Sequence, residues 1–300
     1  MMTTFHPELT SARWLPRSLF PRRLRLFYRL VERLQGWRPG ERLILDGGGE
    51  AWLYRPKVPP TERGPGVLWI HGGGLQMGHA AQDGGTCQAL ADELGAVVVS
   101  AQYRLVPEHP FPAPVEDCFR ALRALAALPE VDARRLAVAG QSAGGGLSAA
   151  VALLARQRGV PLRFQVLIYP MLDDRSSNRV HANADGFRGW CPRDNRDGWS
   201  GYLANVDPKD PPEAAVPGRV LDLAGLPPAW VGVGTLDLFH DEDVDYARRL
   251  QEAGVACELV VVEGAHHGFD VTHATTDVAT AFRRSWVDAL GEALATPAPT

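Results

Sequence analysis

A serine in a tight turn is the first sign of chemistry in this chain. Ser142 is the centre of the pentapeptide Gly-Gln-Ser-Ala-Gly at residues 140–144. The apolar run Leu136–Ala139 precedes it, and a run typical of a helix, residues 145–154, follows it. A strand, G-x-S-x-G and a helix in this order are typical of a nucleophile elbow, a sharp turn that exposes a serine hydroxyl. The pattern therefore predicts that Ser142 is an activated nucleophile.

An acid and a base follow this serine in the chain. A serine hydroxyl needs a base in contact, and that base needs an orienting carboxylate. Asp237 comes after the apolar run Ala229–Gly232, and two histidines, His266 and His267, come after the run Cys257–Val262. The order serine, acid, histidine is the one expected after this elbow. Asp237 is therefore predicted as the acid and one of the two histidines as the base, while spacing does not choose between them.

A run of glycines is placed to stabilise negative charge. His71 and three glycines at 72–74 follow the apolar run Val67–Ile70. Bare glycines let backbone N–H groups approach a substrate, and a histidine-glycine loop in this position forms half of an oxyanion hole. The N–H of the residue after the nucleophile, Ala143, supplies the other half. His71 itself is interpreted as a structural hydrogen-bonding residue.

Strand-like and helix-like runs alternate along most of the chain. This alternation predicts an α/β fold with a mostly parallel eight-stranded sheet, a hairpin at its start and helices on both faces, as in the α/β-hydrolase fold. The predicted strands are Arg42–Asp46, Glu50–Arg55, Val67–His71, Ala96–Ala101, Leu136–Ala139, Phe164–Tyr169, Ala229–Gly232 and Cys257–Val262. The predicted helices are Asp83–Leu94, Pro114–Leu128, Ser142–Arg158, Asp241–Ala253 and Thr275–Leu294. The acidic residues at 241–243 are interpreted as the first turn of a helix, where they suit its dipole.

Residues 173–217 interrupt this alternation with a long stretch rich in Asp, Asn, Arg, Gly and Pro. An insertion of this length in a compact fold predicts a lid or cap. Phe187, Trp190 and Trp199 lie in it. These three aromatic side chains are predicted to wall the substrate site, and the alternative is that they form the core of the cap.

The first forty residues carry eight arginines and two glutamates. Apolar residues from Phe20 to Leu34 recur at steps of four and three, which predicts an amphipathic helix. We expect its apolar face to pack on the rest of the protein; the alternatives are a helix on a membrane surface and a transit peptide. The last residues, 296–300, are predicted to be a disordered tail.

Composition excludes several classes of protein. The net charge of −4 argues against a nucleic-acid-binding protein. The four cysteines are scattered with no C-x-x-C pair, so neither a metal site nor a disulfide framework is expected, and reduced thiols in the cytoplasm are the simplest interpretation. No apolar run is long enough to cross a membrane, and the start of the sequence lacks the apolar stretch of a secretory signal.

The chain resembles the hormone-sensitive-lipase-like esterases, the bacterial group IV carboxylesterases. Its matching motifs span nearly the whole chain in the order of the family. They are residues 71–74, Tyr103–Ala113, residues 140–145, Tyr169–Asp174, Asp237 with Asp241 and Glu242, and His267–Phe269. Two positions differ from the family, which often has Asp or Glu where Gln141 stands and Asn where Gly146 stands. These differences leave the substrate preference open.

The resemblance implies roles for the candidate residues. Ser142 would be the nucleophile, Asp237 the orienting acid and His267 the base, because the family's catalytic histidine directly precedes Gly-Phe. The oxyanion donors would be Gly72, Gly73 and Ala143. The substrate would be a small ester with a short to medium acyl chain, and no metal or organic cofactor would be needed.

The resemblance also implies a domain organisation and leaves other functions open. Residues 1–40 and 173–217 would form a cap over a catalytic core of residues 41–172 and 218–295. One alternative is a binding protein of the same fold without turnover. Another is a hydrolase of amides, thioesters or acetylated natural products. The last predicted strand, Cys257–Val262, is expected at a sheet edge and could pair with a second copy of the chain in a homodimer.

Overall fold

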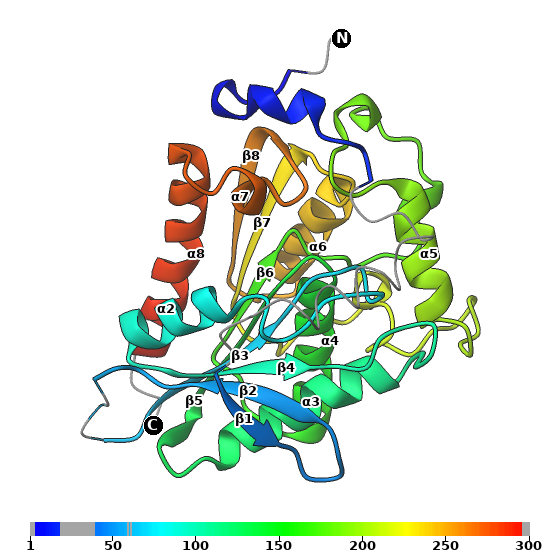
Figure 1. The fold of residues 1–300 in the computed structure, drawn as a ribbon. Coiled ribbons are helices and arrows are strands. Elements are labelled where there is room, and N and C mark those ends of the chain that lie inside the picture. Colours follow the sequence, from blue (N-terminus) through cyan, green and yellow to red (C-terminus); the bar gives the residue numbers. More distant parts are fainter. Residues whose placement is uncertain (1–3, 19–39, 59, 61, 296–300) are drawn as a thin grey trace.

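The computed structural model describes residues 4–18, 40–58, 60 and 62–295, and its centre is an eight-stranded sheet (Figure 1). The strands follow one another across the sheet in the order β1-β2-β4-β3-β5-β6-β7-β8. Only the pairs β1–β2 and β2–β4 are antiparallel. The strands are β1 Glu41–Ile44, β2 Glu50–Tyr54, β3 Gly64–Ile70, β4 Val97–Gln102, β5 Val131–Gln141, β6 Phe164–Ile168, β7 Ala229–Leu236 and β8 Cys257–His266. The predicted mostly parallel α/β-hydrolase sheet with an initial hairpin is confirmed.

Helices cover both faces of this sheet, which explains why its central strands are apolar along their whole length. Every residue of β3 and of β6 is buried. Helices α2 and α8 pack on one face, while α3, α4 and α6 pack on the other (Figure 1). The bounds are α2 Gly84–Leu94, α3 Ala113–Ala127, α4 Ala143–Arg158, α6 His240–Glu252 and α8 Asp277–Ala295. All five predicted helices therefore form, with ends shifted by one or two residues.

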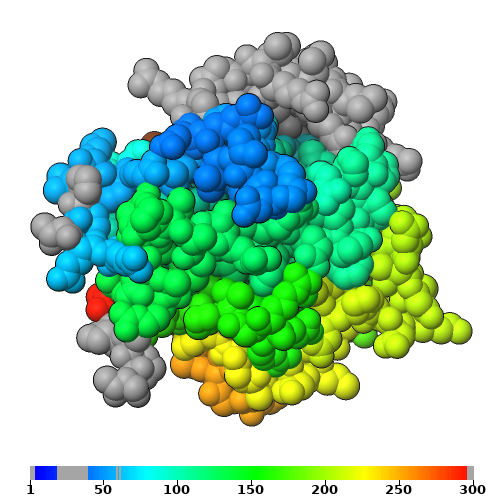
Figure 2. Space-filling model, turned by 90° about the horizontal axis from the view of Figure 1, so that it is seen from below, coloured from blue at the N-terminus to red at the C-terminus, as the bar shows by residue number. Residues whose placement is uncertain are grey.

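The insertion at residues 173–217 folds into one helix and several short turns. Its helix, α5, spans Pro192–Tyr202, and the 3₁₀ turns are η3 Ser176–Asn178, η4 Ala184–Gly186 and η5 Pro217–Arg219, the last of which runs on past the insertion. In Figure 2 the yellow-green part of the chain that follows α5 projects as a knob at the edge of the molecule. Buried aromatic residues on the inner side of α5 join the core cluster that also contains α3 and α4. The insertion is therefore packed on the sheet domain.

A short N-terminal segment bridges the last strand and this insertion. It contains the 3₁₀ helix η1, Pro7–Trp14, in which Leu9 is fully buried. The His6 N–H donates to the carbonyl of Gly264 at the end of β8, and the Pro16 carbonyl accepts from the N–H of Gly189 in the insertion. The predicted helix from Phe20 to Leu34 and the predicted tail at 296–300 lie outside the described residues.

Strand β8 forms one end of the sheet, as expected from the sequence, and Val261 on it is exposed. It is longer than predicted and continues to His266, so that it delivers the two histidines directly to the end of the sheet. None of the helices in the described ranges is both long and apolar enough to cross a membrane.

Candidate active site

Ser142 lies in a strained turn between β5 and α4. Its backbone has φ 56° and ψ −123°, a left-handed conformation that is uncommon for a residue with a side chain. The turn is fixed on both sides, because the Ser142 N–H donates to Ile168 and its carbonyl accepts from Met171. Gly144 lets the helix approach the sheet: a Cβ there would lie 2.0 Å from the Ile70 carbonyl oxygen. The local sequence therefore produces the elbow that the G-x-S-x-G pattern predicts.

A continuous line of hydrogen bonds joins Ser142 to two residues that follow it far along the chain. The Oγ of Ser142 lies 2.9 Å from Nε2 of His267. The Nδ1 of the same ring lies 2.8 Å from Oδ2 of Asp237. The other oxygen of Asp237 accepts from the Phe239 N–H at 3.0 Å, and this carboxylate is only 1% exposed. This is the arrangement in which a carboxylate orients an imidazole that in turn activates a serine.

The neighbouring histidine, His266, is not part of this line. Its Nδ1 lies 2.9 Å from the carbonyl oxygen of His267, and its ring packs edge-on against His273. Burial lowers the pKa of His266 to about 4, so that the ring is neutral at physiological pH. Spacing left both histidines open as the base, and the fold brings only His267 to the serine.

The glycine loop after β3 faces the same serine. Gly73 has φ 117°, and a Cβ there would lie 2.1 Å from the Met77 carbonyl oxygen, so the position requires glycine. Within the described residues, no backbone carbonyl accepts a hydrogen bond from the N–H group of Gly72 or Gly73. Ala143 is the first residue of α4, and its N–H has no acceptor within the helix. These three N–H groups are available to a ligand.

His71 has a structural environment. Its ring stacks on Tyr103 with centroids 4.2 Å apart, and its Nδ1 lies 2.7 Å from the Gly72 carbonyl oxygen. The Tyr103 hydroxyl donates to the carbonyl of His71 at 3.0 Å. Burial lowers the pKa of His71 to about 4. The side chain is thus fixed as a neutral support for the glycine loop.

One cavity contains the serine, and a second lies beside the residue that follows it. The larger, about 210 Å³, contains Ser142, His267, the glycine loop and Trp190. The smaller, about 10 Å³, lies beside Ala143 and is lined by Trp199, Tyr202 and Met171 among other apolar residues. Phe187 lines neither of them in the described part of the chain; it is 2% exposed and packs edge-on against His181. The structure thus places two of the three insertion aromatics at the cavities and the third in the core.

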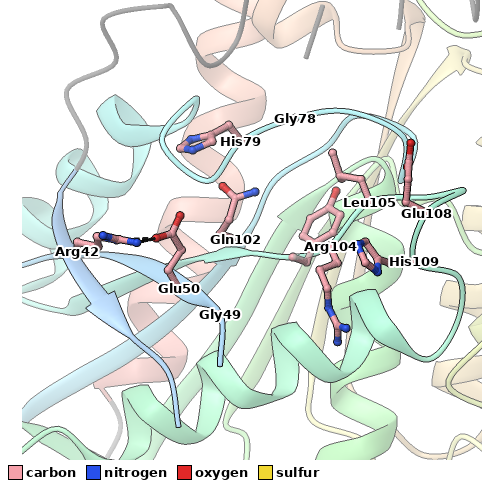
Figure 3. Close-up of a pocket in the computed structure, with 11 residues that line it drawn as sticks. Arg42, Gly49, Glu50, Gly78, His79, Gln102, Arg104, Leu105, Glu108 and His109 are labelled. Carbon is pink, nitrogen blue, oxygen red and sulfur yellow. Dashed lines mark hydrogen bonds and ion pairs between the residues drawn. The ribbon is translucent and has the colours of Figure 1, made fainter. Parts of the chain in front are cut away.

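A third and larger hollow, about 580 Å³, lies beside the glycine loop and shares Gly78 with the cavity of Ser142 (Figure 3). Three of its charged side chains have partners: Arg42 pairs with Glu50, and Arg104 turns away to bind Asp117 in two places. It contains none of the three residues of the hydrogen-bonded line. The reactive geometry therefore belongs to the cavity of about 210 Å³ around Ser142.

The acidic residues at 241–243 differ in their surroundings. Asp241 is exposed and pairs with His240 in the first turn of α6, as interpreted from the sequence. Glu242 is instead buried, and its carboxyl accepts from the N–H groups of Leu172 and Asp173. Burial raises the pKa of Glu242 to about 8. Glu242 lies in the first turn of α6 as interpreted, but burial favours its neutral form over the charge expected to suit the helix dipole, because the segment at Leu172 and Asp173 packs against this turn.

No group of three or more potential metal ligands occurs among the described residues. The cysteines at 87, 118, 191 and 257 all lie in the described part of the chain, and all are free thiols.

The fold and the hydrogen-bonded line define the class to which the protein belongs, and comparison with known proteins agrees. A family model described as alpha/beta hydrolase fold matches residues 67–271. The chain therefore belongs to the alpha/beta hydrolase fold family, which confirms the resemblance found in the sequence.

Several members of this family resemble the chain over most of its length. It is 38% identical to esterase LipI of Mycobacterium tuberculosis over 246 residues, which cover 76% of this chain and 73% of that protein. It is 40% identical to carboxylesterase NlhH of the same organism over 225 residues, covering 70% and 69%. A solved structure titled "Bacterial Heroin Esterase" superposes with a TM-score of 0.85 at 35% identity, covering 98% of this chain and 99% of that one.

Proposed function

We propose that this protein hydrolyses small carboxylic esters with short to medium acyl chains by means of Ser142, His267 and Asp237. The line of hydrogen bonds from Ser142 through His267 to Asp237 carries the proposal. The class of enzyme rests on the family and its relatives, which are named esterases and carboxylesterases. The protein is a carboxylic ester hydrolase, and its substrates are small-molecule esters.

The geometry supports a two-step reaction through an acyl-enzyme. Nε2 of His267, 2.9 Å from Oγ of Ser142, takes the hydroxyl proton while the oxygen attacks the ester carbonyl. Asp237 holds the ring with Nδ1 protonated and stabilises the imidazolium that forms. His267 then gives the proton to the departing alcohol. A water molecule, activated by the same imidazole, hydrolyses the acyl-enzyme and regenerates the serine.

The backbone N–H groups of Gly72, Gly73 and Ala143 are proposed to stabilise the negative charge of the tetrahedral intermediate. Because they belong to a fixed loop and a helix start, they need no rearrangement when the charge develops. Loss of one such donor typically costs about 2.7–4 kcal/mol of transition-state stabilisation. The residues in these proposed roles are all protein groups, and the reaction as written calls for no cofactor.

The two cavities at Ser142 suggest how the two halves of the substrate are distinguished. We assign the acyl group to the small apolar cavity beside Ala143 and the alcohol to the cleft with Trp190. A free volume of about 10 Å³ holds about one water molecule. An acetyl group therefore needs little rearrangement, whereas each further methylene must displace the wall formed by Trp199. Phe187 lines neither cavity in the described part of the chain, so we assign it to the core of the cap.

The acyl assignment is tested with Trp199→Leu and a series of p-nitrophenyl esters from acetate to octanoate. We expect kcat/KM of the wild type to fall as the chain lengthens. In the variant, the ratio of kcat/KM for octanoate to kcat/KM for acetate should rise about tenfold. This is the discrimination that one or two methylenes in an apolar pocket provide. An unchanged ratio would show that the acyl chain lies elsewhere.

Substitution of the nucleophile tests the activity itself. We expect Ser142→Ala to reduce hydrolysis of p-nitrophenyl acetate to the uncatalysed level, while circular dichroism and the Tm stay close to those of the wild type. Ser285→Ala is the matched control, because the hydroxyl of this serine donates to the Phe282 carbonyl within α8, and its loss should leave the rate unchanged. Near-wild-type turnover by Ser142→Ala would contradict the proposal. A single burst of nitrophenol without turnover by the wild type would favour the alternative of a binding protein.

The remaining expectations extend this proposal. The insertion 173–217 is proposed as a cap on the core of residues 41–172 and 218–295, because it supplies Trp190 and Trp199 to the cavities. A cytoplasmic location and the absence of nucleic-acid binding are proposed from composition. The exposed edge of β8 is proposed to pair with β8 of a second copy. Light scattering after size-exclusion chromatography tests this homodimer; a monomeric mass would contradict it.

A further inference from the structure

A buried tyrosine links the two segments that carry the proposed nucleophile and base. Tyr169 follows β6 and has φ 35°, a conformation in which a residue other than glycine is uncommon. Its ring packs edge-on against the ring of His267, with centroids 4.8 Å apart. Its hydroxyl donates to Oδ1 of Asp270 at 2.8 Å and lies 3.4 Å from Oε1 of Gln141. One side chain thus touches the base, the residue before the nucleophile and the helix after the base.

The chain of polar contacts continues on the other side of Gln141. Its amide nitrogen lies 3.3 Å and 3.4 Å from the two carboxylate oxygens of Asp83, just before α2. The indole N–H of Trp69 donates to the same carboxylate at 2.9 Å. The network therefore runs Trp69–Asp83–Gln141–Tyr169–Asp270. It ends on α7, Phe269–Thr272, in the turn that begins with the base.

This network places the carboxyl group of Asp270 near His267, in addition to that of Asp237. Burial raises the pKa of Asp270, and the positive charges of His267 and of Arg283 on α8 act against that rise. Burial likewise raises the pKa of Asp83 to about 6, and repulsion from Asp270 adds to it. His266 is the other titratable group beside His267, and burial keeps it neutral.

We propose that Tyr169, Gln141 and Asp270 are positioning residues for the base: they hold the ring of His267 toward Ser142, and the Asp270 carboxylate stabilises the imidazolium that forms there. This inference rests on the proposed function, since it concerns the same reaction. The observation that carries it is the edge-on contact of the Tyr169 ring with His267, combined with the hydroxyl that ties that ring to Asp270.

The proposal gives a physical meaning to Gln141, where related esterases often carry an acid. A carboxylate at this position would face the carboxylate of Asp83, whose oxygens lie within 3.4 Å of the Gln141 amide nitrogen. Two carboxylates that close cannot both be ionised. The amide nitrogen instead donates to Asp83, and the amide oxygen lies 3.4 Å from the hydroxyl oxygen of Tyr169. In this chain the negative charge near the elbow is supplied by Asp83 and Asp270, and a neutral side chain bridges them.

The sign of the expected pH effect follows from charge. An ionised Asp270 favours the protonated imidazole, so it raises both the stability of the transition state and the pH at which His267 becomes a free base. Removing that charge should therefore lower kcat and move the acid limb of the kcat/KM profile to lower pH. A group that only filled space would change kcat or the Tm without moving this limb.

The test compares Asp270→Asn and Tyr169→Phe with the wild type on p-nitrophenyl acetate between pH 5 and 9. We expect Asp270→Asn to move the midpoint of the acid limb down by about half a pH unit. We expect both variants to lower kcat about threefold to tenfold. This is less than the loss of a whole hydrogen bond to a charged group would cause. For Asp270→Asn, KM should stay within about twofold, because Asp270 does not line the cavity of Ser142. Asp270→Glu keeps the charge and should restore the midpoint.

Tyr246→Phe is the matched control: this tyrosine is fully buried on α6, and its hydroxyl has no partner among the described residues. Its acid limb and kcat should equal those of the wild type. If Asp270→Asn and Tyr169→Phe behave like this control, or lose activity only in proportion to a lower Tm, the inference is wrong. A wild type without ester hydrolysis would instead overturn the proposed function, so the two failures are distinguishable.

Discussion

Replacing Asp237 by asparagine should nearly abolish ester hydrolysis, for a reason that the hydrogen bonds around this carboxylate specify. Its Oδ1 accepts from the Phe239 N–H at 3.0 Å and its Oδ2 faces Nδ1 of His267 at 2.8 Å. In Asp237→Asn, the amide oxygen is the only atom that can accept from Phe239. The NH₂ group must then face Nδ1, which becomes an acceptor, and the ring proton moves to Nε2. In that tautomer the ring cannot take the proton of Ser142.

The size of this effect follows from the loss of the correct tautomer. In a serine hydrolase the substitution lowers kcat about 10⁴-fold, which corresponds to about 5.4 kcal/mol of activation free energy. The assay is p-nitrophenyl acetate hydrolysis at pH 7.5, with the Tm as a check on folding. We expect KM to change little, because the carboxylate is buried behind the base and 1% exposed.

The chain offers a matched control in Asp243, six positions further on. This aspartate is also fully buried, but neither of its oxygens has a hydrogen-bond partner among the described residues. Burial raises its pKa strongly, so it is a neutral acid and nearly isosteric with asparagine. Asp243→Asn should therefore keep wild-type kcat. If Asp237→Asn retained more than a tenth of wild-type kcat, the argument from the tautomer would be refuted.

Two further predictions concern stability. Because the pKa of Glu242 is raised from 4.5 to about 8, the folded protein keeps a proton that the unfolded chain loses, and stability should fall as the pH rises between these values. Glu242→Gln should remove this fall, so its Tm should exceed that of the wild type at pH 8 and approach it at pH 5; equal slopes of Tm against pH would contradict the assignment. At Gly146 a Cβ would lie 2.0 Å from the Met171 carbonyl oxygen, so Gly146→Ala should lower the free energy of unfolding by about 1–3 kcal/mol. Gly85 lies in a helix with no atom within 4 Å of a new Cβ, so Gly85→Ala should raise the free energy of unfolding by up to about 1 kcal/mol. Urea unfolding measures both variants. Similar free energies of unfolding for the two would refute the steric argument.

Most of the sheet domain could be predicted because its signals are local. Buried parallel strands are apolar runs, and each of the eight predicted runs contains or overlaps an observed strand. The predicted ends of β7 and β8 are too early: β7 continues past Gly232 to Leu236, and β8 continues past Val262 to His266. Those residues belong to the sheet through pairing, such as Leu236 with His266, and pairing is not a local property.

The residues around the elbow show the same division. The nucleophile, the acid and the pair of histidines were apparent from residue type and chain order. The choice of His267 over His266 needed either a family resemblance or the fold, since two adjacent residues point in different directions. No sequence pattern marked Tyr169 as a neighbour of the base or Asp83 as a partner of Gln141. The only available signal is that Tyr169 is the last residue of a predicted strand, near the edge where side chains gather at a site.

The sequence by itself thus determined the α/β alternation, the elbow at Ser142, the glycine loop and the order of acid and base, because each depends on neighbours along the chain. Only the tertiary structure decided which insertion aromatics border the cavities and which further carboxyl groups lie near His267, and it placed His267 rather than His266 against Ser142. These depend on distances between segments as far apart as Ser142 and His267, 125 positions along the chain. Hydrogen bonds and packing act over a few ångströms, so it is the folded sheet that brings these groups into range.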